Sequence, residues 1–323
     1  MRLVPSAEQN DFAAVLHDLL AAAEVPAAAD SWAEGDHRPG RRLWSRLAGA
    51  GVTALAVPGR WGGLDAGPAD LVVVAEELGH HAVPGPVAET LAAVPTLLAA
   101  LDEPGRWLPE LAGGRILGTL AAPPWLPYAL DADVADVVLL ADRGAAGPAR
   151  TGAIFESLDP ARRLFEVVPD GPAEICPAIG RALDLGVLVC AAQLLGAGRA
   201  LLEAAVAHAR SRAQFGGPIG RFQAVRHRLA DVAVGLEFAR PLLHAAAVTV
   251  SARDVSAAKV ACADAANRAA RAALQVHGAI GFTREHGLGR WLTKVRALSL
   301  SWGTPADHRA RVMAELAKGE AWN

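Results

Sequence analysis

The last part of this 323-residue chain constrains the fold most, because its apolar residues recur with the period of helices packed in a bundle. Phe222, Val225, Leu229, Val232 and Leu236 follow one another at steps of 3, 4, 3 and 4 residues. This spacing places them on one face of a long helix, as in helical bundles. We expect further helices over residues 182–202, 256–276, 284–301 and 307–323, and therefore a C-terminal helical bundle over residues 179–323.

Residues 1–115 are predicted to form an N-terminal helical domain. Apolar residues recur at 3–4 spacing in the segments 12–20 and 43–47. The run from Leu71 to Leu78 is rich in valine and could be a strand. However, Pro68 with Asp70 is typical of a helix start and Gly79 of a helix end, so we predict a helix there.

The segment 116–178 has a different character. Short β-branched or alternating runs, separated by proline, glycine and aspartate, occur at residues 116–121, 136–141, 152–155 and 164–168. The chain is therefore predicted to be mainly α with a small β domain between two helical ones. About 60 residues are few for a sheet that must also hold a ligand.

Composition excludes several classes of protein. The 31 basic and 34 acidic residues give a net charge of −3, which argues against a nucleic-acid partner. The polar N-terminal residues do not look like a signal peptide, and no uninterrupted apolar run reaches the roughly 18 residues of a membrane span. The cysteines, Cys176, Cys190 and Cys262, lack metal-ligand spacing. We therefore expect a cytoplasmic protein with buried thiols and no metal site.

Two loops between the predicted bundle helices combine glycines with polar side chains, at residues 211–223 and 275–283. Glycines let phosphates approach the backbone, arginine offers a fork of donors to a pyrophosphate, and glutamine pairs with sugar or adenine edges. Composition alone favours the simpler interpretation, two glycine-containing helix turns with an exposed arginine, because glycine commonly ends helices.

At these loops the sequence strongly resembles the acyl-CoA dehydrogenases. The matching motifs are Arg212-x-Gln-Phe-Gly-x-Pro-Ile-Gly-x-Phe-Gln223 and Gln275-x-x-Gly-x-x-Gly-Phe-Thr283, with two more in residues 57–63 and 75–79. The resemblance implies a helical domain, a truncated β-barrel-like domain and a four-helix bundle. It also implies FAD, with α,β-desaturation of an acyl-CoA thioester: a glutamate removes the α-proton while hydride leaves to the flavin.

In dimers of this family the two loops reach the FAD of the neighbouring subunit. Carried over, Arg212 would face the pyrophosphate, with Gln214 and Phe215 lining the same site and Gln223 near the adenosine. Gln275 and Gly278 would close over the dinucleotide, although Ala279 replaces a usual second glycine. The resemblance also places Thr304 at the cofactor.

The sequence departs from the family pattern at the catalytic base. The usual Glu-Gly-Thr element reads Trp302-Gly303-Thr304, and an indole N–H cannot accept a proton. Some members carry the base early in the first bundle helix, where this chain has Gly186. The Thr-Glu-Pro, Gly-Ser-Asp and Gly-x-Lys elements of the β domain are also missing. This chain should therefore lack both a base and its own flavin-ring pocket.

Four other residues are candidates for the base: Asp184, His277, Glu285 and His286. Asp184 is most simply interpreted as a helix-start residue, and Glu285 lies on a turn where a carboxylate is usually structural. His277 adjoins a cofactor loop without an evident catalytic partner. We therefore expect no catalytic residue in this chain.

Intact cross-interface loops and a missing base resemble the α₂β₂ acyl-CoA dehydrogenases of bacterial sterol side-chain degradation. The leading interpretation is the base-less subunit, which completes the FAD site of a longer subunit carrying the glutamate. Acyl-CoA would be the substrate and an electron-transfer flavoprotein the acceptor, with no membrane or nucleic-acid partner. Two alternatives stay open: a non-catalytic homo-oligomeric binding or structural protein, and a homomeric flavoenzyme whose base is unrecognised.

Overall fold

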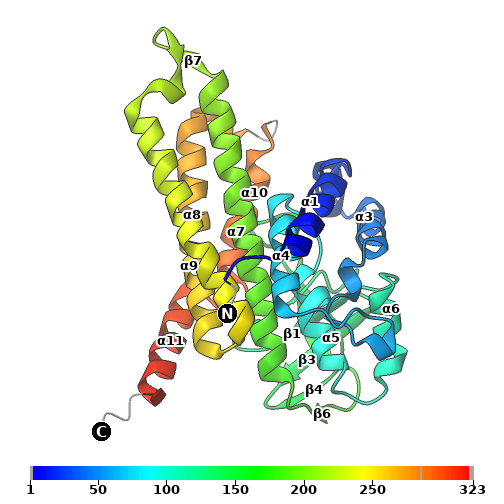
Figure 1. Cartoon of the computed structure of the whole chain (residues 1–323). Helices are drawn as coiled ribbons and strands as arrows, with labels where there is room; N and C mark the ends of the chain where they lie inside the picture. Colours follow the sequence, from blue (N-terminus) through cyan, green and yellow to red (C-terminus); the bar gives the residue numbers. More distant parts are fainter. Residues whose placement is uncertain (1–2, 284–285, 320–323) are drawn as a thin grey trace.

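Three long helices dominate the computed structural model, which describes residues 3–283 and 286–319 (Figure 1). They are α7 (Ile179–Ser211), α8 (Gln223–Thr249) and α9 (Ala252–His277), followed by α10 (Leu288–Leu300) and α11 (Pro305–Gly319). The expected helices are confirmed wherever the structure describes them. Val232 and Leu236 of the predicted stripe are buried, whereas Phe222 is 36% exposed. The stripe therefore enters the core only in its second half.

The N-terminal region is helical, as predicted. It contains α1 (Ala7–Ala21), α2 (Val25–Ala33), α3 (Arg38–Gly49), α4 (Pro68–His80), α5 (Val94–Leu98) and α6 (Leu108–Ala112). In α4 the Asp70 carboxylate accepts the N–H of Gly67 at 2.9 Å, which fixes the helix start. The helix ends at His80, one residue beyond the expected stop at Gly79. Every residue of α4 from Leu71 onward is buried.

A six-stranded sheet lies between the helical regions. Its strands are β1 (Gly118–Ala121), β2 (Ala129–Leu130), β3 (Val137–Asp142), β4 (Ala145–Phe155), β5 (Leu164–Pro169) and β6 (Glu174–Ile175). The order is β1-β3-β4-β5-β2, with β6 beside β4; β1 and β3 are parallel and the other pairs antiparallel. Because β1 and β2 also touch, the sheet curls into a partial barrel. The predicted strands are confirmed, and the boundaries of three separate domains stay a prediction.

Helix α4 crosses α7 at backbone contact. A Cβ atom at Gly79 would overlap the Gln193 backbone, and one at Gly196 would overlap the carbonyl oxygen of Glu76. At the same crossing Arg199 donates to Glu76 at 3.0 Å and to Glu77 at 2.7 Å. Glycines without side chains and a buried ion network therefore join the N-terminal helices to the bundle.

By length and composition, α7 and α8 could each cross a membrane, with mean hydropathies of 1.8 and 1.2 in their most apolar 18 residues. The bent pair α1 and α2 passes the same test. The expectation that the sequence holds no segment of this kind therefore fails on composition. In the fold, 83% of the α7 window is buried inside the protein, so its apolarity serves the core; only 39% of the α8 window is buried.

Gly196→Ala should destabilise the fold by about 1–3 kcal/mol, because the added methyl group must push α4 away from α7. Gly180→Ala, also in α7, is the matched control, since a Cβ atom there meets nothing within 4 Å. The control should be neutral or slightly stabilising. Urea unfolding followed by circular dichroism measures both changes, and equal effects of the two substitutions would contradict this account of the crossing.

Candidate functional site

The two positions at which the resemblance places a catalytic base lie side by side. Gly186 is near the start of α7, and Trp302 follows the end of α10. A Cβ atom at Gly186 would overlap the six-membered ring of the Trp302 indole. The missing side chain at one position thus makes room for the indole at the other. Neither position offers a proton acceptor.

The turn that carries Trp302 is fixed on both sides. Trp302 is 2% exposed and has a φ of 61°, a left-handed conformation that is uncommon for a large side chain. Nε2 of His308 lies 2.8 Å from its carbonyl oxygen, and the next N–H donates to the carbonyl of Trp125 at 3.3 Å. Thr304 then caps α11: its hydroxyl donates to Asp307 at 2.7 Å and accepts the N–H of the same residue at 3.3 Å.

Sequence reasoning missed a buried carboxyl beside this turn. Glu89 begins a single π-helical turn, Glu89–Ala93, and is 1% exposed. Burial raises the pKa of Glu89, while the charge of Arg162 and a hydrogen bond from Trp302 lower that pKa. Its Oε1 has no hydrogen-bond partner among the described residues. The sequence signal for Glu89 was a single acidic residue within the mostly apolar segment 87–98. In the structure, the single π-helical turn adds a second signal, because such turns often occur at functional sites.

Further buried charges lie around Arg162, between the sheet and α10. Arg162 donates to Oγ of Ser301 at 3.0 Å, and Nζ of Lys294 lies 3.5 Å from Oδ2 of Asp159. Burial raises the pKa of Asp131 to about 7, against the opposing hydrogen bond from the Arg163 backbone. Buried charged groups therefore lie beside the part of the apolar core that holds Trp302.

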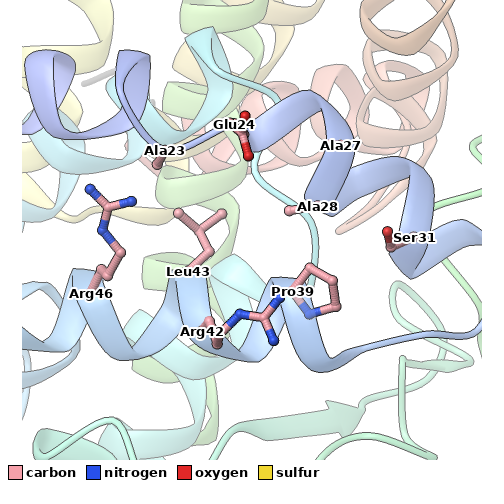
Figure 2. Close-up of a pocket in the computed structure, with 9 residues that line it drawn as sticks. All are labelled: Ala23, Glu24, Ala27, Ala28, Ser31, Pro39, Arg42, Leu43 and Arg46. Carbon is pink, nitrogen blue, oxygen red and sulfur yellow. The ribbon is translucent and has the colours of Figure 1, made fainter.

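A cavity of about 290 Å³ adjoins this corner, between the sheet and α10. It is lined by Trp125, Leu126, Pro127, Tyr128, Glu156, Ser157, Leu158, Arg162, Leu164, Ala297, Leu300 and Ser301. The family elements expected to hold a flavin ring are absent from these lining segments. A larger cavity, of about 510 Å³, lies between α2 and α3, with Arg42 and Arg46 on one wall and Glu24 across from them (Figure 2). It contains none of the predicted site residues.

The other predicted cofactor residues lie at the far end of the bundle, where the α7–α8 hairpin projects at the top of Figure 1. Arg212 directly follows α7, Gln214 lies in β7 (Ala213–Gln214), opposite β8 (Gly217–Pro218), and Gln223 begins α8 after η5 (Ile219–Arg221). Phe215, at the tip, is 82% exposed. The guanidinium of Arg221 donates to the Phe215 and Gly216 carbonyl oxygens and braces the hairpin.

The second loop packs beside the base of this hairpin. Gln275, in the last turn of α9, and Gly278, which begins η6 (Gly278–Phe282), are both exposed. The rings of His208 and His277 stack with centroids 4.3 Å apart, which ties the ends of α7 and α9 together. Thr304 does not join this group. It follows the other end of α10, whose 13 residues span about 20 Å.

The interpretation of Asp184 as a helix-start residue is wrong, because α7 begins at Ile179. Its carboxylate instead pairs with the guanidinium of Arg311 at 2.5 Å, a partner 127 residues away that local sequence cannot reveal. His277 and His286 lie at the cofactor loops, with ring centroids 4.6 Å apart, far from the Trp302 turn. Glu285 lies outside the described residues.

This order of helical region, sheet and long-helix bundle, with glycine-rich loops at the bundle tip, defines the class of FAD-dependent acyl-CoA oxidoreductases. Residues 6–115 match the model of the acyl-CoA dehydrogenase N-terminal domain and residues 177–317 that of the C-terminal domain. The chain belongs to the acyl-CoA dehydrogenase family. The residues between the two matched ranges hold the shortened sheet.

Among individual relatives, the chain is 31% identical to acyl-CoA dehydrogenase IpdE2 of Mycobacterium tuberculosis, over 97% of this chain and 99% of that protein. The ChsE4-ChsE5 complex from the same species has a chain with a TM-score of 0.85 at 22% identity, covering 98% of this chain and 99% of its own. A chain of the steroid enzyme Tcur3481-Tcur3483 has a TM-score of 0.83 at 23% sequence identity, covering 97% of this chain and 99% of its own. The two structures support the fold alone.

Gly186→Ala should destabilise the chain by about 1–3 kcal/mol, because the methyl group overlaps the Trp302 ring. In a Trp302→Ala background the same substitution should cost little, since the ring that it meets is gone. Urea unfolding of the wild type, both single variants and the double variant measures this coupling. Equal costs in the two backgrounds would show that the contact does not determine these residue types.

Asp131→Asn should change how stability depends on pH. The pKa of Asp131 is raised from 3.8 to about 7, so its contribution is fully present below pH 3.8 and is lost as the pH rises through 7. Asparagine keeps an acceptor for the Arg163 N–H but does not titrate. The variant should therefore gain stability relative to wild type between pH 4 and pH 8, measured by thermal unfolding. An unchanged difference across this range would contradict the buried-acid assignment.

Proposed function

We propose that this chain is the base-less subunit of a heteromeric, FAD-dependent acyl-CoA dehydrogenase, which acts in the cytoplasm on a bulky acyl-CoA such as a steroid side-chain thioester. The observation that carries the proposal is the Gly186–Trp302 contact, which fills both base positions with one indole. A partner subunit with an intact glutamate would supply the base. FAD, when bound, takes up the hydride that leaves the β-carbon.

The exposed tip loops support a role toward a neighbour's cofactor. Arg212 makes no ion pair within the described residues, so its five donors are available for a pyrophosphate. Gly216 has a φ of 82° and Gly278 a φ of 65°, which give the loops the close backbone approach that a dinucleotide requires. In our proposal Arg212, Gln214, Phe215, Gln223, Gln275 and Gly278 complete the partner's FAD site, while Thr304 remains at the corner of this chain.

The outer face of α8 supports assembly with other subunits. Val234, Phe238 and Leu242 recur every four residues and are 53%, 74% and 47% exposed. They border a surface groove of about 270 Å³ between α8 and α9. An apolar stripe of this kind on a bundle helix is typical of a protein–protein interface. We assign it to contacts between the subunits of the heteromer.

The relatives are consistent with this reading. Two of the similar structures are named as two-component assemblies, ChsE4-ChsE5 and Tcur3481-Tcur3483, the second described as a steroid enzyme. IpdE2 matches this chain over almost its whole length. We accordingly propose a longer acyl-CoA dehydrogenase as partner and an electron-transfer flavoprotein as electron acceptor.

Glu89 favours one alternative, a homomeric flavoenzyme with an unusual base. Its carboxyl lies beside the Trp302 indole with one oxygen unpartnered among the described residues. Against this alternative, the adjoining cavity lacks the family's flavin-binding elements. The two readings differ in whether the chain alone binds flavin.

The visible absorbance spectrum separates them. The chain purified alone should be colourless, and co-expression with an acyl-CoA dehydrogenase subunit that carries the glutamate should yield a yellow, co-eluting complex. In that complex Arg212→Ala should remove most of the flavin while leaving the fold of the lone chain intact. Arg210→Ala, an exposed arginine in the last turn of α7, is the matched control and should retain it.

Other outcomes would overturn the proposal. Unchanged flavin content in the Arg212→Ala complex would remove this arginine from the cofactor site. A lone chain that is yellow and is bleached by an acyl-CoA, with the bleaching lost in Glu89→Gln, would establish the homomeric alternative.

A further inference from the structure

Three histidines meet at the tip of the bundle, where no role has been assigned to them. His208 lies near the end of α7, His277 ends α9, and His286 precedes α10. The centroids of His208 and His277 are 4.3 Å apart, and those of His277 and His286 are 4.6 Å apart. One ring nitrogen from each lies within 4.8 Å of the other two. Three separate segments therefore converge on one point.

His277 has the orientation of a metal ligand. It is 6% exposed, and its Nδ1 lies 2.7 Å from the carbonyl oxygen of Ala273, so Nδ1 carries the proton and donates it. The other nitrogen, Nε2, then presents a lone pair, and it has no hydrogen-bond partner among the described residues. A backbone carbonyl that fixes the tautomer and leaves Nε2 free is the usual outer support of a metal-binding histidine.

The other two histidines can supply the same kind of donor. His208 and His286 are partly exposed, and each brings a ring nitrogen to the same point, one from the last turns of α7 and the other from the segment before α10. Neutral imidazole is the form that binds a metal. Imidazole ligands suit zinc and its neighbours in the transition series and do not suit calcium or magnesium.

A second histidine cluster, His17, His80 and His81, lacks this property. Nε of Arg199 donates to Nδ1 of His80 at 3.1 Å, which consumes that lone pair and places the proton on Nε2. Nδ1 of His17 lies 2.9 Å from a carboxylate oxygen of Glu77 and is engaged there. This cluster adjoins the ion network between α4 and α7, and each of its three rings has a nitrogen already engaged by a neighbouring side chain.

We propose that His208, His277 and His286 bind one divalent transition-metal ion of the zinc class, with water or an external donor as the fourth ligand. The expectation of no metal site rested on cysteine spacing and could not detect ligands drawn from three segments. Nitrogens around a tetrahedral zinc lie about 3.3 Å apart, given Zn–N distances of about 2.0–2.1 Å. Binding would therefore draw the three rings slightly together.

The position gives the ion a structural role. It would join the base of the α7–α8 hairpin to the end of α9 and the start of α10, and so fix the spacing of the two loops that carry Arg212 and Gln275. The site is independent of the proposed function, because all its ligands come from one chain and none is assigned to the cofactor. Its test needs neither flavin nor a partner subunit.

The experiment is a zinc titration of the full chain without a polyhistidine tag, after EDTA treatment and gel filtration. Competition with a chromogenic zinc chelator should show one zinc ion per chain. His208→Gln and His286→Gln should each weaken binding at least about tenfold, because each removes one of three ligands. His227→Gln, an exposed histidine of α8 outside the cluster, is the matched control and should bind as the wild type does.

A second measurement uses Co²⁺ in place of zinc, since tetrahedral coordination gives intense d–d absorption, whereas octahedral Co²⁺ bound at the surface absorbs only weakly. This absorption should appear at one equivalent and be lost in both variants. Because both variants alter partly exposed rings, they should fold even where His277→Gln does not. Wild-type zinc affinity in His208→Gln and His286→Gln, or absence of binding to the wild type, would overturn the proposal.

Discussion

The close crossing of α4 and α7 is the constraint on which the rest of the structure depends. Two glycines bring the helix backbones into contact, and Arg199 bridges to two buried glutamates at the same place. Partly buried ion pairs of this kind tolerate little displacement, because separating them leaves uncompensated charge. With this crossing fixed, α7 presents Gly186 to the Trp302 turn at its start and the exposed hairpin at its end.

Several buried polar groups gather behind Trp302 and influence one another through their charges. The buried Trp302 indole lies beside the carboxyl of Glu89, whose pKa it lowers. A buried carboxyl in turn needs a compensating charge, which Arg162 provides, and Arg162 also donates to Ser301. These polar groups thus surround an indole at the position where the resemblance expects a carboxylate.

Sequence reasoning recovered the parts of the molecule that local patterns determine. The helix over Leu71–Leu78 followed from its cap and termination signals, and the strands from their alternation. It failed wherever the decisive partner was distant in the chain: Asp184 with Arg311, Glu89 with Trp302, and the histidine cluster. Gly186 and Trp302 were each recognised as departures from the family pattern, but only the fold shows that they are one contact.

The contact between Gly186 and Trp302 also explains why this corner differs at more than one residue from a site that holds a catalytic carboxylate. A carboxylate at position 302 would lie against the buried carboxyl of Glu89, and two like charges in a closed site raise each other's pKa and hold a proton between them. It would also lose the indole that fills the space above Gly186. The closed corner at Trp302 and the exposed tip loops therefore lie at opposite ends of α7, and our proposal assigns the first to a lost base and the second to a neighbour's cofactor.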